Sequence, residues 1–471
     1  MPLTFVETVR TLAVARSASI RREAWALLCL GGPVVGTQLA QISMHTVDAI
    51  MAGRLGPRDL AAVSLGGSLW MPIFVFGMGI LMSISPNVAH SFGAGESTAI
   101  GRQVRQGLWL SQVVALGAFL VIRGSTPVLE WFGVDPQIIP TATGFLRAIS
   151  WGLPALCAFV VLRGFSEAVS MTRPLLFISL LALAANIAGN SLLMYGRWGL
   201  PRLGAVGTGI SSAIVMWLMF GCLLGWIAWH PYYRRFEVFG RLDRPDFAAL
   251  WKLLKLGVPI GVCLFMEGSL FAAVALLLGR MGEAVVAGHQ IAINVASITF
   301  MVPLGISIAV TVRVGQALGR QDVAGARRSG TVGALLAMSF MALAGLTLAL
   351  IPRAIAAVYT PDPGVQVLAV RLLYMAAIFQ VFDGLQVAGS GALRGLKDTS
   401  SAMLITVVAY WGVGLPLGYF LGIVRDGGPQ AMWTGLIVGL VVSSILLNLR
   451  FQRVMGRRLR TEVVAGTVGG G

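Results

Sequence analysis

The fold is decided by a stretch that occurs twice, GGPVVGTQLAQISMHTVDAIMAGRLG at 31–56 and GVPIGVCLFMEGSLFAAVALLLGRMG at 257–282. Both copies carry Gly-x-Pro near the start and Gly-Arg-x-Gly at the end, 226 residues apart. The same offset, without a gap, relates Gly79-Ile80 to Gly305-Ile306, Gly93 to Gly319 and Arg102 to Arg328. A later pair, Leu162-Arg163-Gly164 and Leu393-Arg394-Gly395, follows at an offset of 231. Such a register predicts an internal repeat.

Both copies are long and apolar enough to cross a membrane, which takes roughly 20 residues of helix. The composition agrees, because 56% of the 471 residues are hydrophobic, only 11% are charged, and the mean hydropathy is +0.82. Soluble proteins carry about 25% charged residues. These values exclude a cytosolic enzyme, a secreted disulfide-rich domain and a disordered chain. They predict an all-α polytopic membrane protein.

Twelve apolar stretches predict twelve transmembrane helices. Their approximate extents are 25–51, 60–85, 107–128, 143–164, 174–195, 206–229, 256–279, 285–311, 331–352, 367–392, 401–423 and 430–449. Each half holds six spans, and this even number makes the two repeats parallel, an arrangement that places a shared cavity between two lobes. The predicted organisation is an N-terminal segment (1–24), a first lobe (25–229), an inter-lobe loop (230–255), a second lobe (256–449) and a basic tail (450–471).

The net charge of +16 comes from 35 Lys and Arg against 19 Asp and Glu. Basic residues gather in alternate loops, and the 230–255 loop alone holds Arg234, Arg235, Arg241, Arg244, Lys252 and Lys255. The positive-inside rule therefore predicts that both termini and this loop are cytoplasmic. Anionic lipids of the inner leaflet account for the charge, so no nucleic-acid partner is expected. We expect a multi-pass protein of the bacterial inner membrane.

The sequence lacks the residues that several catalytic mechanisms require. The four cysteines lie in apolar runs, and the four histidines do not have the spacing of metal ligands. The sequence contains no G-x-x-x-x-G-K-[ST] loop, so ATP hydrolysis of the usual P-loop kind is excluded. We expect neither an enzyme nor a bound cofactor.

Three acids fall inside predicted spans, Asp48 in the first, Glu267 in the seventh and Asp383 in the tenth. An acid at the bilayer centre costs at least about 2.5 kcal/mol, so it persists only where it faces a cavity or a partner. These carboxylates are expected to attract a proton, Na⁺ or an organic cation; the alternative is a neutral acid that is hydrogen-bonded to another helix. Asn186 and Asn190, four residues apart on the fifth span, either complete a polar site with Asp48 or bond elsewhere.

Three motifs occur in order along the chain. They are Pro33 followed by Gln41-x-x-Met44-x-x-Val47-Asp48-Ala49-Ile50-Met51-Ala52-Gly53, then Phe265-Met266-Glu267 with Ala287-Gly288-His289-Gln290-Ile291-Ala292-x-Asn294, then Asp383 with Gly389-Ser390-Gly391-x-Leu393-Arg394-Gly395-x-Lys397-Asp398-Thr399. The sequence thereby resembles, over nearly its whole length, the MATE (multidrug and toxic compound extrusion) transporters of the NorM type. The first motif is similar to their first helix, the second to their seventh and eighth helices, and the third to their tenth helix and the loop after it.

The resemblance implies two six-helix lobes around a V-shaped central cleft and export of cationic, amphipathic compounds against inward cation flow. Glu267 and Asp383 match the cation-coupling acids of the second lobe, and they would be the metal ligands if Na⁺ is the coupling ion. Asp48, Asn186 and Asn190 match the polar, protonatable site of the first lobe. Polar residues expected to line the cleft are Gln41, His289, Gln290, Asn294 and Gln380.

The leading hypothesis is a secondary antiporter, acting as a monomer among membrane lipids, that exchanges small cationic drugs or dyes for Na⁺ or H⁺. The alternative is a lipid-linked-sugar flippase of the same wider superfamily, which needs a cationic cavity for phosphate, whereas the deep charges here are acidic. A membrane-embedded enzyme needs convergent His, Asp or Ser side chains, and only His45 shares a span with a deep acid. A channel is distinguished from an exporter by transport under an imposed gradient.

Overall fold

The computed structural model describes residues 5–131, 133–199, 201–240 and 243–468, and among these the side chains of residues 19–461. The described chain is helical and contains no strand. Its elements, in chain order, are α1 (Phe5–Leu55), α2 (Pro57–Leu81), α3 (Ile84–Gly93), α4 (Ser97–Arg123), α5 (Thr126–Trp131), α6 (Ile139–Ser150), α7 (Leu153–Ala168), α8 (Arg173–Leu193), η1 (Arg197–Gly199), α9 (Ala205–Trp229), α10 (Pro231–Arg234), α11 (Phe247–Gly279), α12 (Glu283–Gly319), α13 (Val323–Leu350), α14 (Pro352–Tyr359), α15 (Pro363–Gly395), α16 (Thr399–Val407), η2 (Val408–Gly414), α17 (Leu415–Tyr419), η3 (Phe420–Val424) and α18 (Gly428–Val468).

Eleven helices of the described chain are long and apolar enough to cross a membrane, and one bent pair brings the number of spans to as many as twelve. This agrees with the twelve predicted spans. The bent pair is α6 and α7, which meet at 47° where the sequence predicts a single span over 143–164. The break falls at Gly152, and Pro154 lacks the N–H that would bond to the carbonyl of Ser150. The helix α1 is longer than predicted, because the predicted N-terminal segment is helical from Phe5 onward.

The helix boundaries repeat at the offset found in the sequence. The helix α2 begins at Pro57 and α12 at Glu283, each directly after a glycine with positive φ, Gly56 at 143° and Gly282 at 112°. The starts of α4 (Ser97) and α13 (Val323) are likewise 226 residues apart. The internal repeat is therefore a repeat of structure as well as of sequence.

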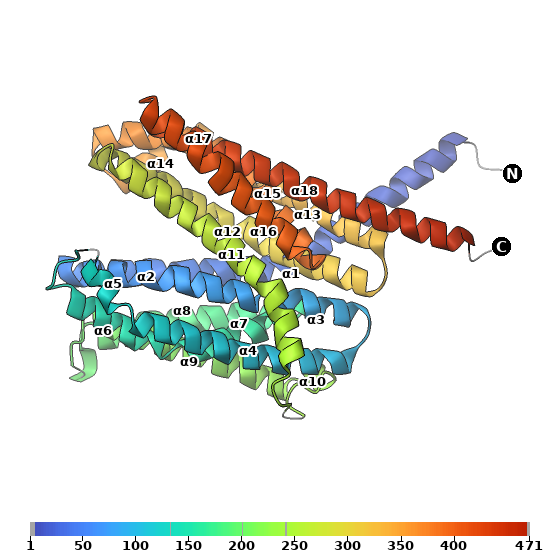
Figure 1. Ribbon diagram of the computed structural model, residues 1–471, viewed down its shortest axis with the longest axis horizontal. Coiled ribbons are helices and arrows are strands. Elements are labelled where there is room, and N and C mark those ends of the chain that lie inside the picture. The colour runs from blue at the N-terminus through green and yellow to red at the C-terminus, as the bar shows by residue number, and fades with distance from the viewer. Residues whose placement is uncertain (1–4, 132, 200, 241–242, 469–471) are drawn as a thin grey trace. The chain divides into compact units, whose positions relative to one another are not determined.

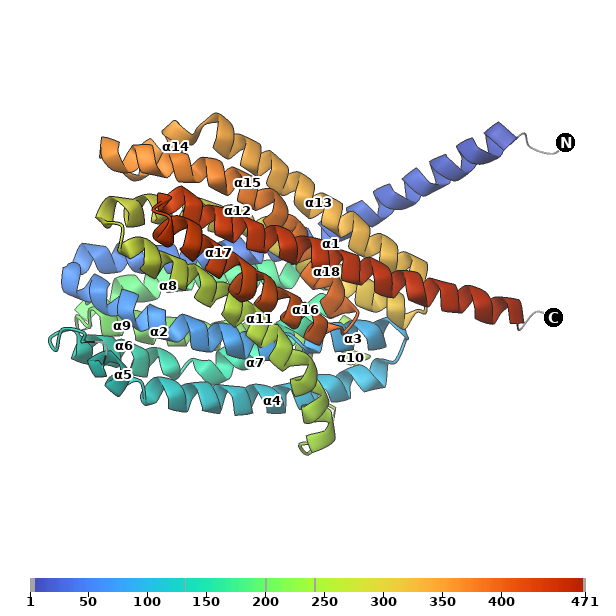
Figure 2. The same ribbon diagram turned by 45° about the horizontal axis from the view of Figure 1, so that its top comes forward.

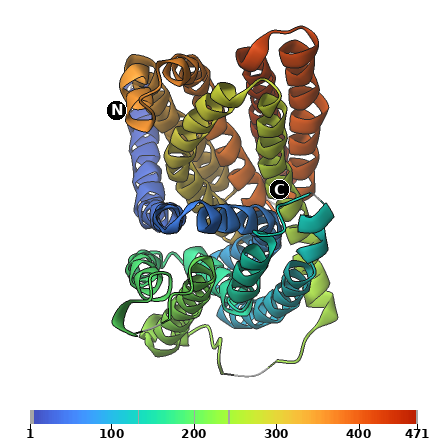
Figure 3. The same ribbon diagram turned by 90° about the vertical axis from the view of Figure 1, so that its left-hand side faces the viewer.

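The chain divides into two compact units. Unit 1 comprises Met1–Val35, Ala272–Asp398 and Leu404–Gly471, and unit 2 comprises Gly36–Phe271 and Thr399–Met403. In unit 1, α13 and α15 pack against α12, and α18 packs against α15, as Figures 1 and 2 show. In unit 2, α7 packs against α4, and α6 and α8 pack against α9; Figure 3 shows these helices nearly end-on. The predicted lobes assign α1 and α11 each to one lobe, whereas the compact units divide both helices.

Two close helix crossings explain this division. In unit 1, a Cβ added at Gly305 of α12 would lie 3.0 Å from the backbone nitrogen of Val35 in α1. In unit 2, a Cβ at Gly257 of α11 would lie 2.9 Å from the carbonyl carbon of Ile80 in α2, and a Cβ at Gly79 would lie 2.7 Å from the nitrogen of Gly261. Only glycine permits such an approach of two backbones. The repeated Gly-x-Pro and Gly-Ile motifs thus mark the crossings that bind the first helix of one half to the second helix of the other.

Candidate functional site

Asp48 of α1 is held by two amides from α8. The Nδ2 atoms of Asn190 and Asn186 both donate to Asp48 Oδ1, at 2.5 Å and 3.1 Å, and Asn190 also lies 3.4 Å from Asn186 Oδ1. Asn186 and Asn190 are almost completely buried, at 2% and 0% exposed, because their spacing of four puts both on the inward face of the helix. The structure therefore brings together the three residues that the sequence places in the first-lobe polar site.

The geometry of this group suits the binding of a small cation. Both amides donate to the same carboxylate oxygen, and no hydrogen bond to Asp48 Oδ2 is present among the described residues. The carboxylate is thus fixed in orientation while one oxygen stays available to a proton or a cation. On the same helix, the backbone oxygen of Met51 accepts a hydrogen bond from the hydroxyl of Tyr195 at 2.9 Å, which ties α1 to the segment after α8.

A second polar group in unit 2 centres on Arg163 of α7. Its Nε donates to Glu167 Oε1 at 2.8 Å, its Nη2 to Gln38 Oε1 at 2.6 Å and its Nη1 to Gln41 Oε1 at 3.4 Å. The side chains of Arg163 and Glu167 are only 12% and 7% exposed, so this is a largely buried ion pair. It explains how Gln41, expected in the cleft, is held.

Sequence reasoning missed this group, since it identified Arg163 only as part of the repeated Leu-Arg-Gly motif. The signal was present, because Arg163 and Glu167 stand four residues apart and opposite charges at that spacing meet on one helix face. A buried glutamate and its guanidinium partner therefore add to the three deep acids found from the sequence.

The two acids of the second half lie in different units, and each is described within its own. Asp383 of α15 belongs to unit 1 and is buried, at 6% exposed. Glu267 of α11 belongs to unit 2 and is half-buried. Among the described residues, no group of three or more His, Cys, Asp or Glu side chains is placed to hold a metal ion.

A ring cluster and an amide surround the Asp383 segment in unit 1. Trp433 of α18 donates from Nε1 to Nδ1 of His289 at 3.2 Å, and its ring packs edge-on against Phe379 with centroids 6.1 Å apart. Gln380 is completely buried, and neither atom of its amide has a hydrogen-bond partner among the described residues. Because Gln380 and Asp383 are three residues apart in one helix, they share a face. An unsatisfied amide on that face is a free donor and acceptor beside a carboxylate.

The residues expected to line a cleft differ in exposure. Gln290 and Asn294 of α12 are exposed, whereas His289 and Gln380 are buried and Gln41 is half-buried. Their lining role stays a prediction.

The sequence profile of the MatE family matches the chain over residues 33–192 and 259–420. The two matches begin at Pro33 and Pro259, which are 226 residues apart and therefore coincide with the internal repeat. Both long matches together cover more than half of the chain.

Curated relatives are similar over nearly the whole length. The multidrug resistance protein PmpM of Pseudomonas aeruginosa is 40% identical over 454 residues, which cover 95% of each chain. The probable multidrug resistance protein NorM of Shewanella oneidensis is 40% identical over 444 residues, covering 93% of this chain and 97% of that protein. The multidrug resistance protein MdtK of Yersinia enterocolitica is 40% identical over 439 residues, covering 91% and 95%.

Solved structures share the fold at lower identity. The crystal structure of the eukaryotic MATE transporter AtDTX14 has a TM-score of 0.85 at 18% identity and covers 93% of this chain and 99% of that one. A MATE family transporter of the MOP superfamily in an outward-facing conformation has a TM-score of 0.83, also at 18% identity, and covers 93% and 96%.

Proposed function

The chain belongs to the MATE family of membrane transporters, and from that premise we propose that it is a multidrug efflux antiporter that exports cationic, amphipathic compounds in exchange for inward Na⁺ or H⁺. We place it in the bacterial inner membrane as a monomer, with both termini and the 230–255 loop in the cytoplasm. The basic residues of that loop support this orientation.

The observation that carries the proposal is the carboxylate of Asp48. It lies within a helix long and apolar enough to span the membrane, it is oriented by two buried asparagine amides, and no ion pair of Asp48 is present among the described residues. A carboxylate in that environment is stabilised by taking up a cation or a proton. Exchange of that cation for a cationic drug moves the drug across the membrane without ATP.

Glu267 and Asp383 are the proposed coupling acids of the second half. Support for Asp383 comes from its burial and from the free amide of Gln380 on the same helix face. Support for Glu267 comes from its position inside α11, where it is the one charged residue between Lys255 and Gly279. If Na⁺ is the coupling ion, these two carboxylates supply oxygen ligands; if H⁺ is, they exchange protons.

The test uses purified protein in sealed proteoliposomes loaded with ethidium, with a Na⁺ gradient or a pH gradient imposed separately. Antiport predicts that ethidium moves against its own gradient under at least one of the two ion gradients. Movement only down the ethidium gradient, whatever the ions, would identify a channel and contradict the proposal. Asp48→Asn in the same vesicles should abolish uphill movement, which separates transport from dye partitioning into lipid.

A further inference from the structure

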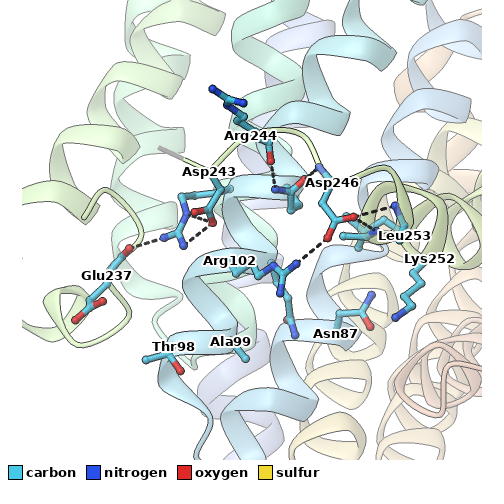
Figure 4. A pocket seen from close by; sticks show the side chains of 15 residues that line it. Asn87, Thr98, Ala99, Arg102, Glu237, Asp243, Arg244, Asp246, Lys252 and Leu253 are labelled. Carbon is cyan, nitrogen blue, oxygen red and sulfur yellow. Dashed lines mark hydrogen bonds and ion pairs between the residues drawn. The ribbon is translucent and has the colours of Figure 1, made fainter. Parts of the chain in front are cut away.

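In unit 2, two ion pairs hold the segment that begins at Asp243 against α4. Arg102 donates from Nη2 to Asp246 Oδ2 at 2.7 Å, and Arg105 contacts Asp243 Oδ2 at 2.7 Å (Figure 4). Asp246 also accepts hydrogen bonds from the backbone of Ala249 and Ala248 at the start of α11. These backbone donors, together with Arg102, hold the pKa of Asp246 below its usual range, so the aspartate is ionised at neutral pH.

A cavity of about 1030 Å³ lies beside these two ion pairs. The side chains that matter for its chemistry are Arg102, Lys252, Asn87 and Gln103, and Ala249 forms part of its wall. Figure 4 shows Asn87 between Arg102 and Lys252 in this view. No ion pair of Lys252 is present among the described residues. Gln103 donates from Nε2 to the hydroxyl of Ser91 at 2.9 Å, and its Oε1, an acceptor, is buried without a hydrogen bond. The whole lining includes four basic residues (Arg102, Arg105, Arg244 and Lys252) and three acidic ones (Glu237, Asp243 and Asp246), an excess of one positive charge.

The corresponding place in unit 1 is filled by a buried ion pair. Glu23 of α1 accepts hydrogen bonds from Arg313 of α12 at 2.9 Å and 2.6 Å, and from Ser329 of α13 at 2.7 Å. Neighbouring Arg328 donates to the hydroxyl of Ser19. Hydrogen bonds among these five side chains thus connect the three helices.

The repeat offset of 226 shows what replaces this pair in unit 2. The counterparts of Glu23, Arg313, Ser329 and Arg328 are, in that order, Ala249, Asn87, Gln103 and Arg102. All four line the cavity. Unit 2 therefore has neither a carboxylate nor a guanidinium at the positions that match Glu23 and Arg313, has an arginine at the position that matches Arg328, and carries Lys252 where unit 1 has Ala26. The cavity thus lies where, at the repeat offset, unit 1 has an ion pair.

We propose that this cavity binds the phosphate head group of an anionic phospholipid, with Arg102 and Lys252 supplying charge and the second N–H of the Asn87 amide, whose first is bonded to the backbone oxygen of Ser83, donating a hydrogen bond. Positive charge and N–H donors are what recognise a phosphate group. The lipid lies in the cytoplasmic leaflet if the orientation proposed above holds. Basic pockets between helices on that side take such head groups.

Exposed aromatic side chains favour a lipid over a soluble phosphate. Phe247 and Trp251, in the first turns of α11, are 83% and 69% exposed, and Trp109 of α4 is 43% exposed. Aromatic residues at this kind of position mark the membrane–water interface. Trp251 directly precedes Lys252, so a head group at Lys252 has an apolar surface for its acyl chains alongside.

The test measures lipid binding to the full-length protein in detergent, by native mass spectrometry with dioleoylphosphatidylglycerol against dioleoylphosphatidylcholine. Lys252→Gln is expected to weaken binding of the anionic lipid about fivefold, the effect of one basic residue near an anionic surface. The matched control is Lys255→Gln, an exposed lysine one turn further along α11 that does not line the cavity. The control is expected to leave the affinity unchanged. Transport is not involved, so failure here is distinguishable from failure of the antiport proposal.

A second variant fills the cavity with the side chains of the other half. Ala249→Glu combined with Asn87→Arg reproduces the Glu23–Arg313 pair and should remove the preference for the anionic lipid. Equal weakening by Lys252→Gln and Lys255→Gln would overturn the proposal, because the attraction would then be that of a general basic surface. Full anionic-lipid affinity in the filled variant would overturn it as well. So would equal affinity for glycerol 3-phosphate and for the lipid, which would identify a site for soluble phosphate. If the filled variant does not fold, the two lysine variants decide.

Discussion

Arg313 donates two hydrogen bonds to Glu23, from Nε to Oε1 at 2.9 Å and from Nη2 to Oε2 at 2.6 Å. The Glu23 side chain is 7% exposed and that of Arg313 is 27% exposed, so the pair is shielded on its acidic side. Since Ser329 adds a third hydrogen bond, this one carboxylate connects α1, α12 and α13 of unit 1.

Loss of the Glu23 charge should therefore destabilise unit 1. We expect Glu23→Gln to lower the free energy of unfolding by about 1–3 kcal/mol, because it leaves Arg313 without its counter-charge. Adding Arg313→Gln should recover part of this loss, which a double-mutant cycle by SDS titration measures. Asp398→Asn is the control, since the Asp398–Arg450 pair is more exposed and should contribute less than about 1 kcal/mol. Equal losses for Glu23→Gln and Asp398→Asn would contradict the structural role.

Removal of the Asp48 charge should stop transport and leave the fold intact. We expect Asp48→Asn to reduce ethidium efflux at least tenfold at equal expression, because an amide of the same shape carries no charge to attract a cation and does not take up a proton. Thermal unfolding of the purified variant should shift little. Glu130→Gln, which alters an exposed acid of the same unit, should transport normally. Normal efflux by Asp48→Asn would remove Asp48 from the mechanism.

Glu267 and Asp383 should act on one coupling step. If both are needed to bind the ion, Glu267→Gln, Asp383→Asn and the double variant should all lose efflux to nearly the same extent. Substrate efflux at equal expression, driven by whichever ion gradient the wild type uses, is the measurement. Two independent roles would instead give losses that multiply, and that pattern would refute a common step.

The glycine crossing of unit 2 should tolerate no side chain. A valine at Gly79 would place its Cβ 2.7 Å from the backbone nitrogen of Gly261, and relieving such a contact typically costs about 1–3 kcal/mol. We expect Gly79→Val to lower the yield of monodisperse protein and its unfolding temperature. Gly67→Val is the matched control on the same helix, because a Cβ there meets nothing within 4 Å. Comparable behaviour of the two variants would show that the crossing does not require glycine.

The proposed orientation can be tested at the two ends of α9. A cysteine at Phe239, which is 47% exposed, should resist an impermeant thiol reagent added to intact cells and react once they are lysed. A cysteine at Trp198, which is 92% exposed and precedes α9, should react in intact cells. Mass shift of the purified protein reports both. The reverse pattern would place the termini outside.

Much of the fold can be predicted from the sequence. The thickness of the membrane sets the length of each apolar stretch, and the spacing of the repeated motifs sets the register of the two halves. Apolar runs of about 20 residues give the spans, and the Gly-x-Pro and Gly-Arg-x-Gly motifs give the offset that the helix starts obey. The bend of 47° between α6 and α7 lies at Gly152 and Pro154, inside a stretch that the sequence predicts as one span. Hydropathy records the span and not its angle, because membrane helices tolerate proline where neighbours satisfy the freed carbonyls.

The polar sites were predicted in part. Asp48, Asn186 and Asn190 stand out in the sequence because each is polar inside an apolar run. The role of Arg163 was not predicted. Hydropathy alone does not distinguish a basic residue exposed at the end of a span from one that donates a hydrogen bond to a buried partner such as Gln38. Partners more than 100 residues apart, such as Glu23 and Arg313, are likewise fixed only by packing.

The division of α1 between the two units bears on how the chain is made. The described part of α1 up to Val35 belongs to a unit whose other members begin at Ala272. On a ribosome adding about 5–20 residues per second, the start of α1 waits on the order of half a minute for its partners. The amino-terminal half alone therefore lacks the helices against which the start of α1 packs. A polypeptide divided within 230–255 should fold only when both pieces are synthesised in the same cell.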